Sequence, residues 1–258
     1  MRQIGFEPLS SGGMAAAATE VAPGVHRLGN WFVNFYLLEE ERRLTLVDAG
    51  LPRLRGQLEA ALAERGRSIR DVEAVILTHA HSDHIGFAGS LQKEGFPVHV
   101  HEADAEMARM GKVGERERSL LPYLRNRAAW KLLASGARGG LPQKVAEVRT
   151  FADGDVLDVP GRPRVVHAPG HSHGCVAFHL PDRGALLVGD VLCTYNPLTG
   201  RRGPQIMAGA FNASSAQALQ SLGALEPLEA AVTLFGHGDP WRDTPAAAVA
   251  RAREAGPS

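Results

Sequence analysis

The 258-residue sequence has little of what marks secreted or membrane-spanning proteins. Its only two cysteines, Cys175 and Cys193, are too few for a disulfide framework and favour buried free thiols in a reducing compartment. No apolar run reaches the length of a membrane span, and no signal-type apolar segment follows a basic start. We therefore expect a cytoplasmic protein without a membrane partner, preceded by a flexible tail over residues 1–20.

An excess of charge of one sign is also missing. Lys and Arg together number 28, Asp and Glu together number 28, and the formal net charge is zero. Surfaces that bind nucleic acid usually show an excess of cations. The balance therefore predicts a small-molecule substrate and no nucleic-acid partner, whereas the sequence leaves the oligomeric state open.

One common metallo-hydrolase signature is absent as well. The sequence contains no His-Glu-x-x-His motif of the kind that binds zinc on a helix. Any metal-dependent hydrolysis must therefore come from another group of residues.

Such a group is present in His79-Ala-His81-Ser-Asp83-His84, which directly follows the apolar run 72–77. Imidazole and carboxylate side chains are metal ligands. Four ligands this close cannot all serve one tetrahedral ion, because adjacent residues such as Asp83 and His84 point in different directions. The spacing therefore indicates two neighbouring metals, an arrangement that activates water. We expect the motif to lie on a loop after a strand rather than on a helix.

Three further segments repeat the same pattern, in which an apolar strand is followed by a metal-ligand residue near glycine. They end in His171, Asp190 and His237. Ligands at strand ends can converge on one edge of a sheet, and glycine lets the backbone pack closely around an ion.

Hydrophobic periodicity predicts β-rich and helical regions in alternation. We expect strands at 25–28, 32–38, 44–47, 72–77, 98–101, 149–151, 156–159, 164–167, 175–180, 185–188 and 231–235. We expect helices at 53–65, 87–94, 103–110, 120–133, 214–222 and 245–254. The helical stretch at about 103–140 has a charged centre and a glycine-rich exit, and both a lid over the site and a plain structural helix pair remain open.

Taken in order, Asp48, the His79–His84 motif, His171, Asp190 and His237 resemble the five motifs of the metallo-β-lactamase superfamily. The resemblance runs from about Val25 to Gly238. It implies an α/β (α+β) fold: an αβ/βα sandwich of two mixed sheets with outer helices. Residues 21–258 would then form a single domain of this type, with the helical insertion at about 103–140.

The resemblance also implies a role for each motif residue. His79, His81 and His171 would hold one metal, Asp83, His84 and His237 would hold a second, and Asp190 would bridge the two. Asp48 would orient a ligand from outside the ligand set. The cofactors would be two Zn²⁺ ions, with Fe or Mn possible, and Asp83 and Asp190 would take part directly in catalysis. Between them the metals would hold a hydroxide formed near neutral pH.

The expected reaction is hydrolysis of an ester, thioester or lactone by this hydroxide. A mononuclear iron dioxygenase acting on persulfides remains an alternative, because ligand motifs can persist where metal occupancy is lost. A β-lactamase is a weaker alternative, because Asp190 stands where those enzymes often carry Cys and no Lys follows Lys144. A metal-stabilised scaffold without activity is disfavoured by the complete ligand set.

The substrate is expected to contact side chains on the loops around the site. The candidates are Trp31, Tyr123, Trp130, His173 and Tyr195. An exposed loop histidine is an alternative interpretation of His173. The loops carry mostly apolar residues, which favours a medium-sized, partly hydrophobic substrate.

Overall fold

The computed structural model describes residues 18–111 and 114–258. Most of the expected tail, residues 1–17, lies outside the described part. The first strand begins at Thr19, two residues before the expected boundary, because Thr19 and Glu20 pair antiparallel with Arg27 and His26.

Seven strands form the larger sheet, in the same order as in the sequence. The first four pair antiparallel and the last four pair parallel, so the sheet is mixed. Its strands are β1 (Thr19–Ala22), β2 (Val25–Gly29), β3 (Asn34–Glu40), β4 (Arg43–Val47), β5 (Val72–Ile76), β6 (Val98–His101) and β7 (Arg149–Phe151).

The second sheet has four strands in the order β13-β10-β9-β8. β13 pairs parallel with β10, whereas the other two pairs are antiparallel. A separate hairpin joins β11 and β12. These strands are β8 (Arg164–His167), β9 (Val176–Leu180), β10 (Ala185–Gly189), β11 (Cys193–Tyr195), β12 (Arg202–Gln205) and β13 (Val232–Phe235).

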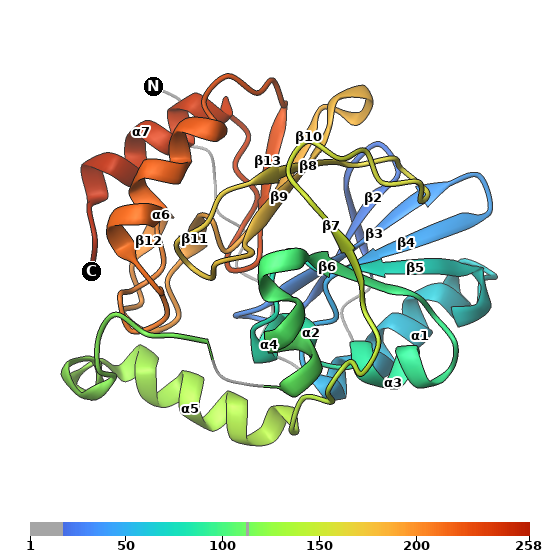
Figure 1. Cartoon of the computed structure of the whole chain (residues 1–258), viewed down its shortest axis with the longest axis horizontal. Helices are drawn as coiled ribbons and strands as arrows, with labels where there is room; N and C mark the ends of the chain where they lie inside the picture. The colour runs from blue at the N-terminus through green and yellow to red at the C-terminus, as the bar shows by residue number, and fades with distance from the viewer. Residues whose placement is uncertain (1–17, 112–113) are drawn as a thin grey trace.

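Helices cover the outer faces of both sheets (Figure 1). α1 and α3 pack on the larger sheet, and α6 and α7 pack on the smaller one. The helices are α1 (Arg55–Glu64), α2 (Ser82–Ile85), α3 (Ala88–Lys93), α4 (Ala105–Met110), α5 (Arg127–Gly139), α6 (Ser215–Ser221) and α7 (Pro245–Ala255). The expected αβ/βα sandwich is confirmed.

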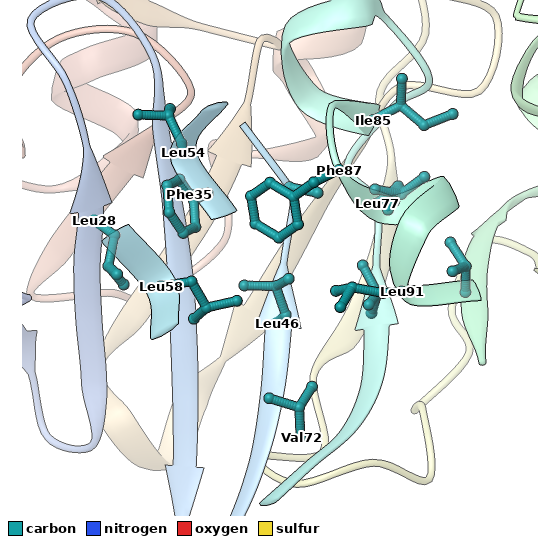
Figure 2. Close-up of a cluster of buried hydrophobic side chains, with 14 of the residues drawn as sticks. Leu28, Phe35, Leu46, Leu54, Leu58, Val72, Leu77, Ile85, Phe87 and Leu91 are labelled. Carbon is teal, nitrogen blue, oxygen red and sulfur yellow. The ribbon is translucent and has the colours of Figure 1, made fainter. Parts of the chain in front are cut away.

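The alternation of side chains along the strands produces these layers. In β3, Phe35 and Leu37 face the helices, whereas Tyr36 and Leu38 face the second sheet. Figure 2 shows Phe35 beside Phe87 and Leu58 in the layer under the helices. Because successive strand residues point to opposite faces, each central strand contributes to two hydrophobic layers at once.

Several expected elements differ in the structure. No strand forms at 156–159, where Val156 makes only an isolated bridge to Arg164. Pro160 and Pro163 lack a backbone N–H, and Arg162 has a positive φ of 41°, so the chain turns there instead of pairing. The short strands β1, β11 and β12 were not predicted from the sequence.

The helix expected at 120–133 is two elements. A 3-10 turn at Leu121–Arg125 ends at Asn126, whose backbone is extended, and α5 then runs six residues beyond the expected end. Together with α4 these elements connect β6 to β7, which are parallel and therefore need a crossover connection. Within residues 18–111 and 114–258, no helix is both long enough and apolar enough to cross a bilayer.

Candidate metal centre

The seven expected metal ligands lie where strands of both sheets end. His79 and His81 follow β5, His171 follows β8, Asp190 follows β10 and His237 follows β13. The loop expected for the first motif is only partly present, because Asp83 and His84 lie in the short helix α2. The expectation that the adjacent Asp83 and His84 point apart is wrong, because their ligand atoms and that of His237 lie within 4.8 Å of one another.

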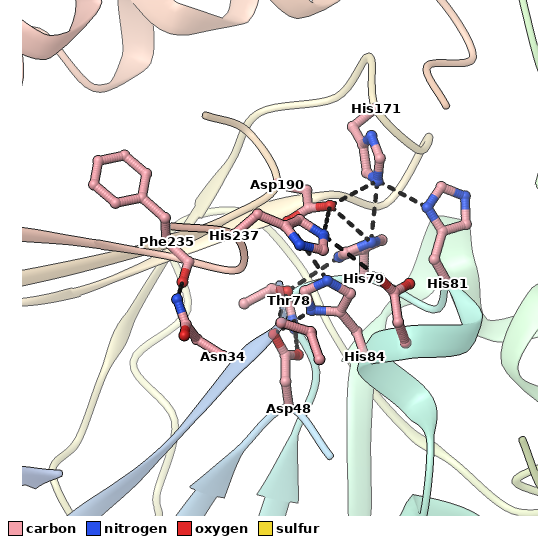
Figure 3. Close-up of polar contacts among 12 residues, drawn as sticks. Asn34, Asp48, Thr78, His79, His81, His84, His171, Asp190, Phe235 and His237 are labelled. Atoms are coloured by element: carbon pink, nitrogen blue, oxygen red, sulfur yellow. Dashed lines mark hydrogen bonds and ion pairs between the residues drawn. The ribbon is translucent and has the colours of Figure 1, made fainter. Parts of the chain in front are cut away.

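The ligand atoms form three overlapping groups, each within 4.8 Å. One group joins His79, His81 and His171, another joins Asp83, His84 and His237, and the third joins His79 and His84 to Asp190. Figure 3 shows the imidazoles surrounding the Asp190 carboxylate. The structure thus brings together the complete set that the sequence suggested.

Hydrogen bonds set the orientation of His84 and His79. The Nδ1 atom of His84 lies 2.8 Å from a carboxylate oxygen of Asp48, which only accepts. The Thr78 hydroxyl donates to the same carboxylate at 2.8 Å and therefore accepts from Nδ1 of His79 at 3.1 Å. Both Nδ1 atoms thus carry a proton, and both Nε2 atoms face the centre.

The same arrangement holds His171 and His237. The Asn212 amide donates through its nitrogen to the Met207 carbonyl, so its oxygen accepts from Nδ1 of His171 at 3.1 Å. Nδ1 of His237 donates to the backbone carbonyl of Phe32. Four buried imidazoles therefore hold a proton on Nδ1 and direct their Nε2 atoms toward the Asp190 carboxylate.

Several of these inward-facing atoms are not satisfied by hydrogen bonds. Nε2 of His84 and Oδ1 of Asp190 are buried without a partner and lie 3.5 Å apart. Nε2 of His171 lies 3.1 Å from Nε2 of His79 and 2.8 Å from Nδ1 of His81. Lone pairs that face one another repel, and buried acceptors without a partner are costly. Divalent cations would satisfy all of them, so the donor set fits metal ions.

The electrostatic environment differs between the two groups of ligands. Burial and the neighbouring imidazoles hold the pKa of His79 well below its usual range and lower the pKa of His171 to about 3. Burial also opposes protonation of His84, but the Asp190 and Asp48 carboxylates outweigh it and raise the pKa of His84 to about 10. The His237 and His84 imidazoles hold the pKa of Asp190 well below its usual range despite burial. The environment therefore keeps His79 and His171 neutral, whereas the carboxylates around His84 favour a positive charge there.

Asp48 is not itself in the ligand groups, but its hydrogen bonds fix the positions of Thr78 and His84. Its carboxylate accepts from the Thr78 backbone N–H at 2.8 Å in addition to the two bonds described above. Its backbone has a positive φ of 60°, a region that Asp tolerates better than most residues. The strained turn after β4 therefore aims one carboxylate at both Thr78 and His84.

Asp104 is a site residue that the sequence analysis missed. Its buried carboxylate accepts from the backbone N–H of Ala80 at 3.1 Å, from the Ser172 hydroxyl at 2.7 Å and from the backbone N–H of Gly174 at 2.7 Å. It therefore joins the loop that carries His81 to the loop that carries His171. An acidic residue soon after a strand end was the only signal in the sequence.

Two glycines leave room for the ligands. A Cβ atom on Gly236 would lie 2.2 Å from Oδ1 of Asp190 and 2.5 Å from the His84 ring. A Cβ atom on Gly189, which has a positive φ of 51°, would lie 2.5 Å from the Thr78 hydroxyl. Any side chain at either position would displace a ligand or a group that orients one.

A cavity of about 600 Å³ opens beside the ligands. Its lining includes His81, Asp83, His171, Asp190 and His237. Most of its remaining wall is apolar and includes Phe32, Leu51, Leu124, Leu132, Met207 and Phe211. The connection between β6 and β7 contributes a large share of this wall, so it lies next to the site.

The expected substrate contacts lie near this cavity but are not among its lining residues. Trp31 packs edge-on against Tyr195 with ring centroids 6.1 Å apart, and its neighbour Phe32 lines the cavity instead. The buried Tyr123 donates its hydroxyl to the Ser258 carbonyl at 2.6 Å.

The other two candidates point outward. Trp130 is exposed, and its indole N–H donates to the Leu124 carbonyl at 2.9 Å. His173 is exposed and lies 3.3 Å from Glu115, which lines the cavity. The neighbours of these residues, rather than the residues themselves, form the wall.

Comparison with known proteins agrees with this geometry. Residues 28–237 match the family model described as the metallo-beta-lactamase superfamily. The probable metallo-hydrolase YflN of Bacillus subtilis (strain 168) is 25% identical over 257 residues, which cover 91% of each chain. Acyl-coenzyme A thioesterase MBLAC2 of Bos taurus is 31% identical over 170 residues, which cover 62% of this chain and 58% of MBLAC2.

A solved structure shares the fold. The metallo-beta-lactamase family protein TTHA1429 from Thermus thermophilus superposes with a TM-score of 0.65 and 28% identity, covering 89% of this chain and 78% of that protein. The family model spans most of the sequence, including every strand from β3 to β13 and all seven ligand residues. This chain therefore belongs to the metallo-β-lactamase superfamily.

Proposed function

We propose that this chain is a hydrolase that uses two divalent cations, with zinc the expected metal, to cleave an ester, thioester or lactone bond in a small molecule. One observation carries the proposal: four buried imidazoles with protonated Nδ1 atoms direct their Nε2 atoms at Asp190. Imidazole nitrogens around a buried carboxylate are a set of ligands that fits divalent cations.

Each of the seven ligand residues is assigned to one cation or to both. His79, His81 and His171 would hold one cation, and Asp83, His84 and His237 would hold the other. Asp190 would contact both, because its Oδ2 atom lies 3.3 Å from Nε2 of His171 and 3.1 Å from Nε2 of His237, while its Oδ1 atom faces His84. Cations in these positions would supply a water of lowered pKa and an electrophile for a carbonyl oxygen.

Other groups around the cations would accept a proton, orient the ligands and exclude water. Asp83 lies 3.4 Å from Nε2 of His237 and is partly exposed at 24%, so its carboxylate is placed to accept a proton beside the cavity. Asp48 and Asn212 keep His84 and His171 in the metal-binding tautomer. The apolar wall would exclude water from the far end of the cavity.

A thioester is the preferred substrate class within this group. The apolar wall suits an acyl group, and MBLAC2, which is similar to 62% of this chain, is named an acyl-coenzyme A thioesterase. Esters and lactones present the same carbonyl carbon and remain in the proposal.

Metal analysis followed by a substrate screen tests the proposal. Protein purified without added metal should contain about two zinc ions per chain. It should hydrolyse members of a panel of p-nitrophenyl esters, acyl thioesters and lactones in the presence of Zn, Mn or Fe. One iron per chain with persulfide oxidation, or hydrolysis of a chromogenic cephalosporin in preference to the panel, would overturn it.

A further inference from the structure

The connection between β6 and β7 contains a stretch with an unusual charge pattern. Residues 118–144 include six cations and no Asp or Glu, although the whole chain has equal numbers of both signs. The cations are Arg118, Arg125, Arg127, Lys131, Arg138 and Lys144. This stretch is therefore a local positive surface within a neutral protein.

The same stretch exposes large apolar side chains. The exposed fractions are 73% for Leu121, 59% for Trp130, 46% for Leu133 and 90% for Leu141. Among the described residues only three other large apolar side chains are comparably exposed. Isolated exposed apolar residues are ordinary, but a group of them beside cations marks an interaction surface.

Helix α5 separates the two kinds of side chain. Arg127, Lys131 and Arg138 recur at helical spacing and lie along one side, all exposed. Within residues 18–111 and 114–258, none of these three cations forms an ion pair with a carboxylate. The opposite side of the helix lines the cavity through Leu132 and Gly136.

On the helix, Trp130 lies between the cationic side and the cavity side. Leu133 and Leu141 are exposed and also line the cavity. The apolar part of this surface therefore continues into the cavity wall.

We propose that residues 118–144 dock on an anionic lipid bilayer, with the cationic side of α5 at the lipid headgroups and Trp130, Leu133 and Leu141 in the interface. A basic helix with an apolar side that carries Trp and Leu is typical of segments that lie in the plane of a membrane surface. A second copy of the chain would oppose like charges, and nucleic acid would leave the leucines unsatisfied.

The proposal revises the expectation of no membrane partner. That expectation rested on the absence of a long apolar run, which a spanning helix needs and an interfacial helix does not. Docking in this orientation would place the cavity opening at the lipid surface. The inference concerns binding alone and is independent of the proposed hydrolysis.

Vesicle binding tests the proposal with the full-length, metal-loaded protein. Cosedimentation is measured with vesicles of phosphatidylcholine alone and with vesicles that also contain phosphatidylglycerol. We expect binding to the anionic vesicles only, weakened by salt, with a blue shift of tryptophan emission that disappears in Trp130→Phe. The triple variant Arg127→Gln, Lys131→Gln, Arg138→Gln should bind roughly 100-fold more weakly.

A matched triple variant, Arg42→Gln, Arg70→Gln, Arg242→Gln, removes the same charge from exposed positions elsewhere and should bind like the unaltered protein. Absence of binding to anionic vesicles would overturn the proposal. Equal loss in both triple variants would also overturn it, since binding would then depend on total charge alone. Tighter binding to a single-stranded oligonucleotide than to vesicles, lost in the α5 variant, would replace the lipid with nucleic acid.

Discussion

The Asp104 carboxylate accepts a hydrogen bond from the Ser172 hydroxyl at 2.7 Å, across 68 positions of sequence. Through its other bonds the same carboxylate holds the backbones of Ala80 and Gly174. The distance between the loops that carry His81 and His171 therefore depends on one buried side chain.

Replacing Asp104 with Asn should weaken metal binding without removing a ligand. One carboxylate oxygen becomes an amide that cannot accept, so one of the three bonds is lost. Groups that orient metal ligands typically contribute roughly 10- to 100-fold to affinity, and we expect a loss of about this size for one of two metals. Competition with a chelator measures it. Asp182→Asn, on an exposed turn, is the control, and equal affinities in both variants would contradict a positioning role for Asp104.

Replacing Asp190 with Asn should lower the content of both metals and reduce hydrolysis by orders of magnitude. The substitution keeps the shape of the side chain but removes the negative charge that lies among four imidazoles. Elemental analysis and initial rates report the two effects separately. Full metal occupancy with an unchanged rate would rule out a bridging position for this carboxylate.

Asp83→Ala and His237→Ala should each lose about one metal per chain and keep the other. Both side chains belong to the group around His84, whereas His79, His81 and His171 form a separate group. His81→Ala, which removes a ligand from that separate group, is the matched variant and should lose the other metal. Retention of two metals in the first two variants would show that the ligands are divided differently.

Leu132→Ala should change the ranking of acyl substrates more than it changes metal content. Leu132 lines the cavity, so truncating its side chain enlarges the space next to the apolar wall. Tyr123→Phe is the comparison, because Tyr123 lies outside the wall and loses only its bond to the Ser258 carbonyl. That variant should cost about 1 kcal/mol of stability and leave the ranking unchanged. Kinetics on acyl esters of increasing length, with thermal unfolding, distinguish the two, and the reverse pattern would mean that the wall is misassigned.

The ligand set could be predicted because its signals are local in the sequence. His79, His81, Asp83 and His84 stand within six residues, and the remaining ligands each follow an apolar strand. The buried strands were equally recognisable, since β5 and β10 are nearly continuous apolar runs. The metal centre and the layers of the fold therefore followed from short patterns.

The supporting residues could not be found in this way. Asp104 and Asn212 act on loops that are 24 to 70 positions away in the chain, and only the fold brings them there. The residues of α5 that line the cavity were missed for a different reason. The break at Asn126 restarts the helix, so the side of α5 that faces the site could not be derived from a continuous 120–133 pattern.

The backbone and the side chain of Phe32 both contact His237, and each contact has a different effect. Its backbone carbonyl accepts the proton of the His237 ring, while its side chain stacks on that ring at 5.8 Å and lines the cavity. No substitution removes a carbonyl from the main chain. A substitution at position 32 would therefore change the packing on the His237 ring and the shape of the cavity while the carbonyl that sets the tautomer of this histidine stays in place.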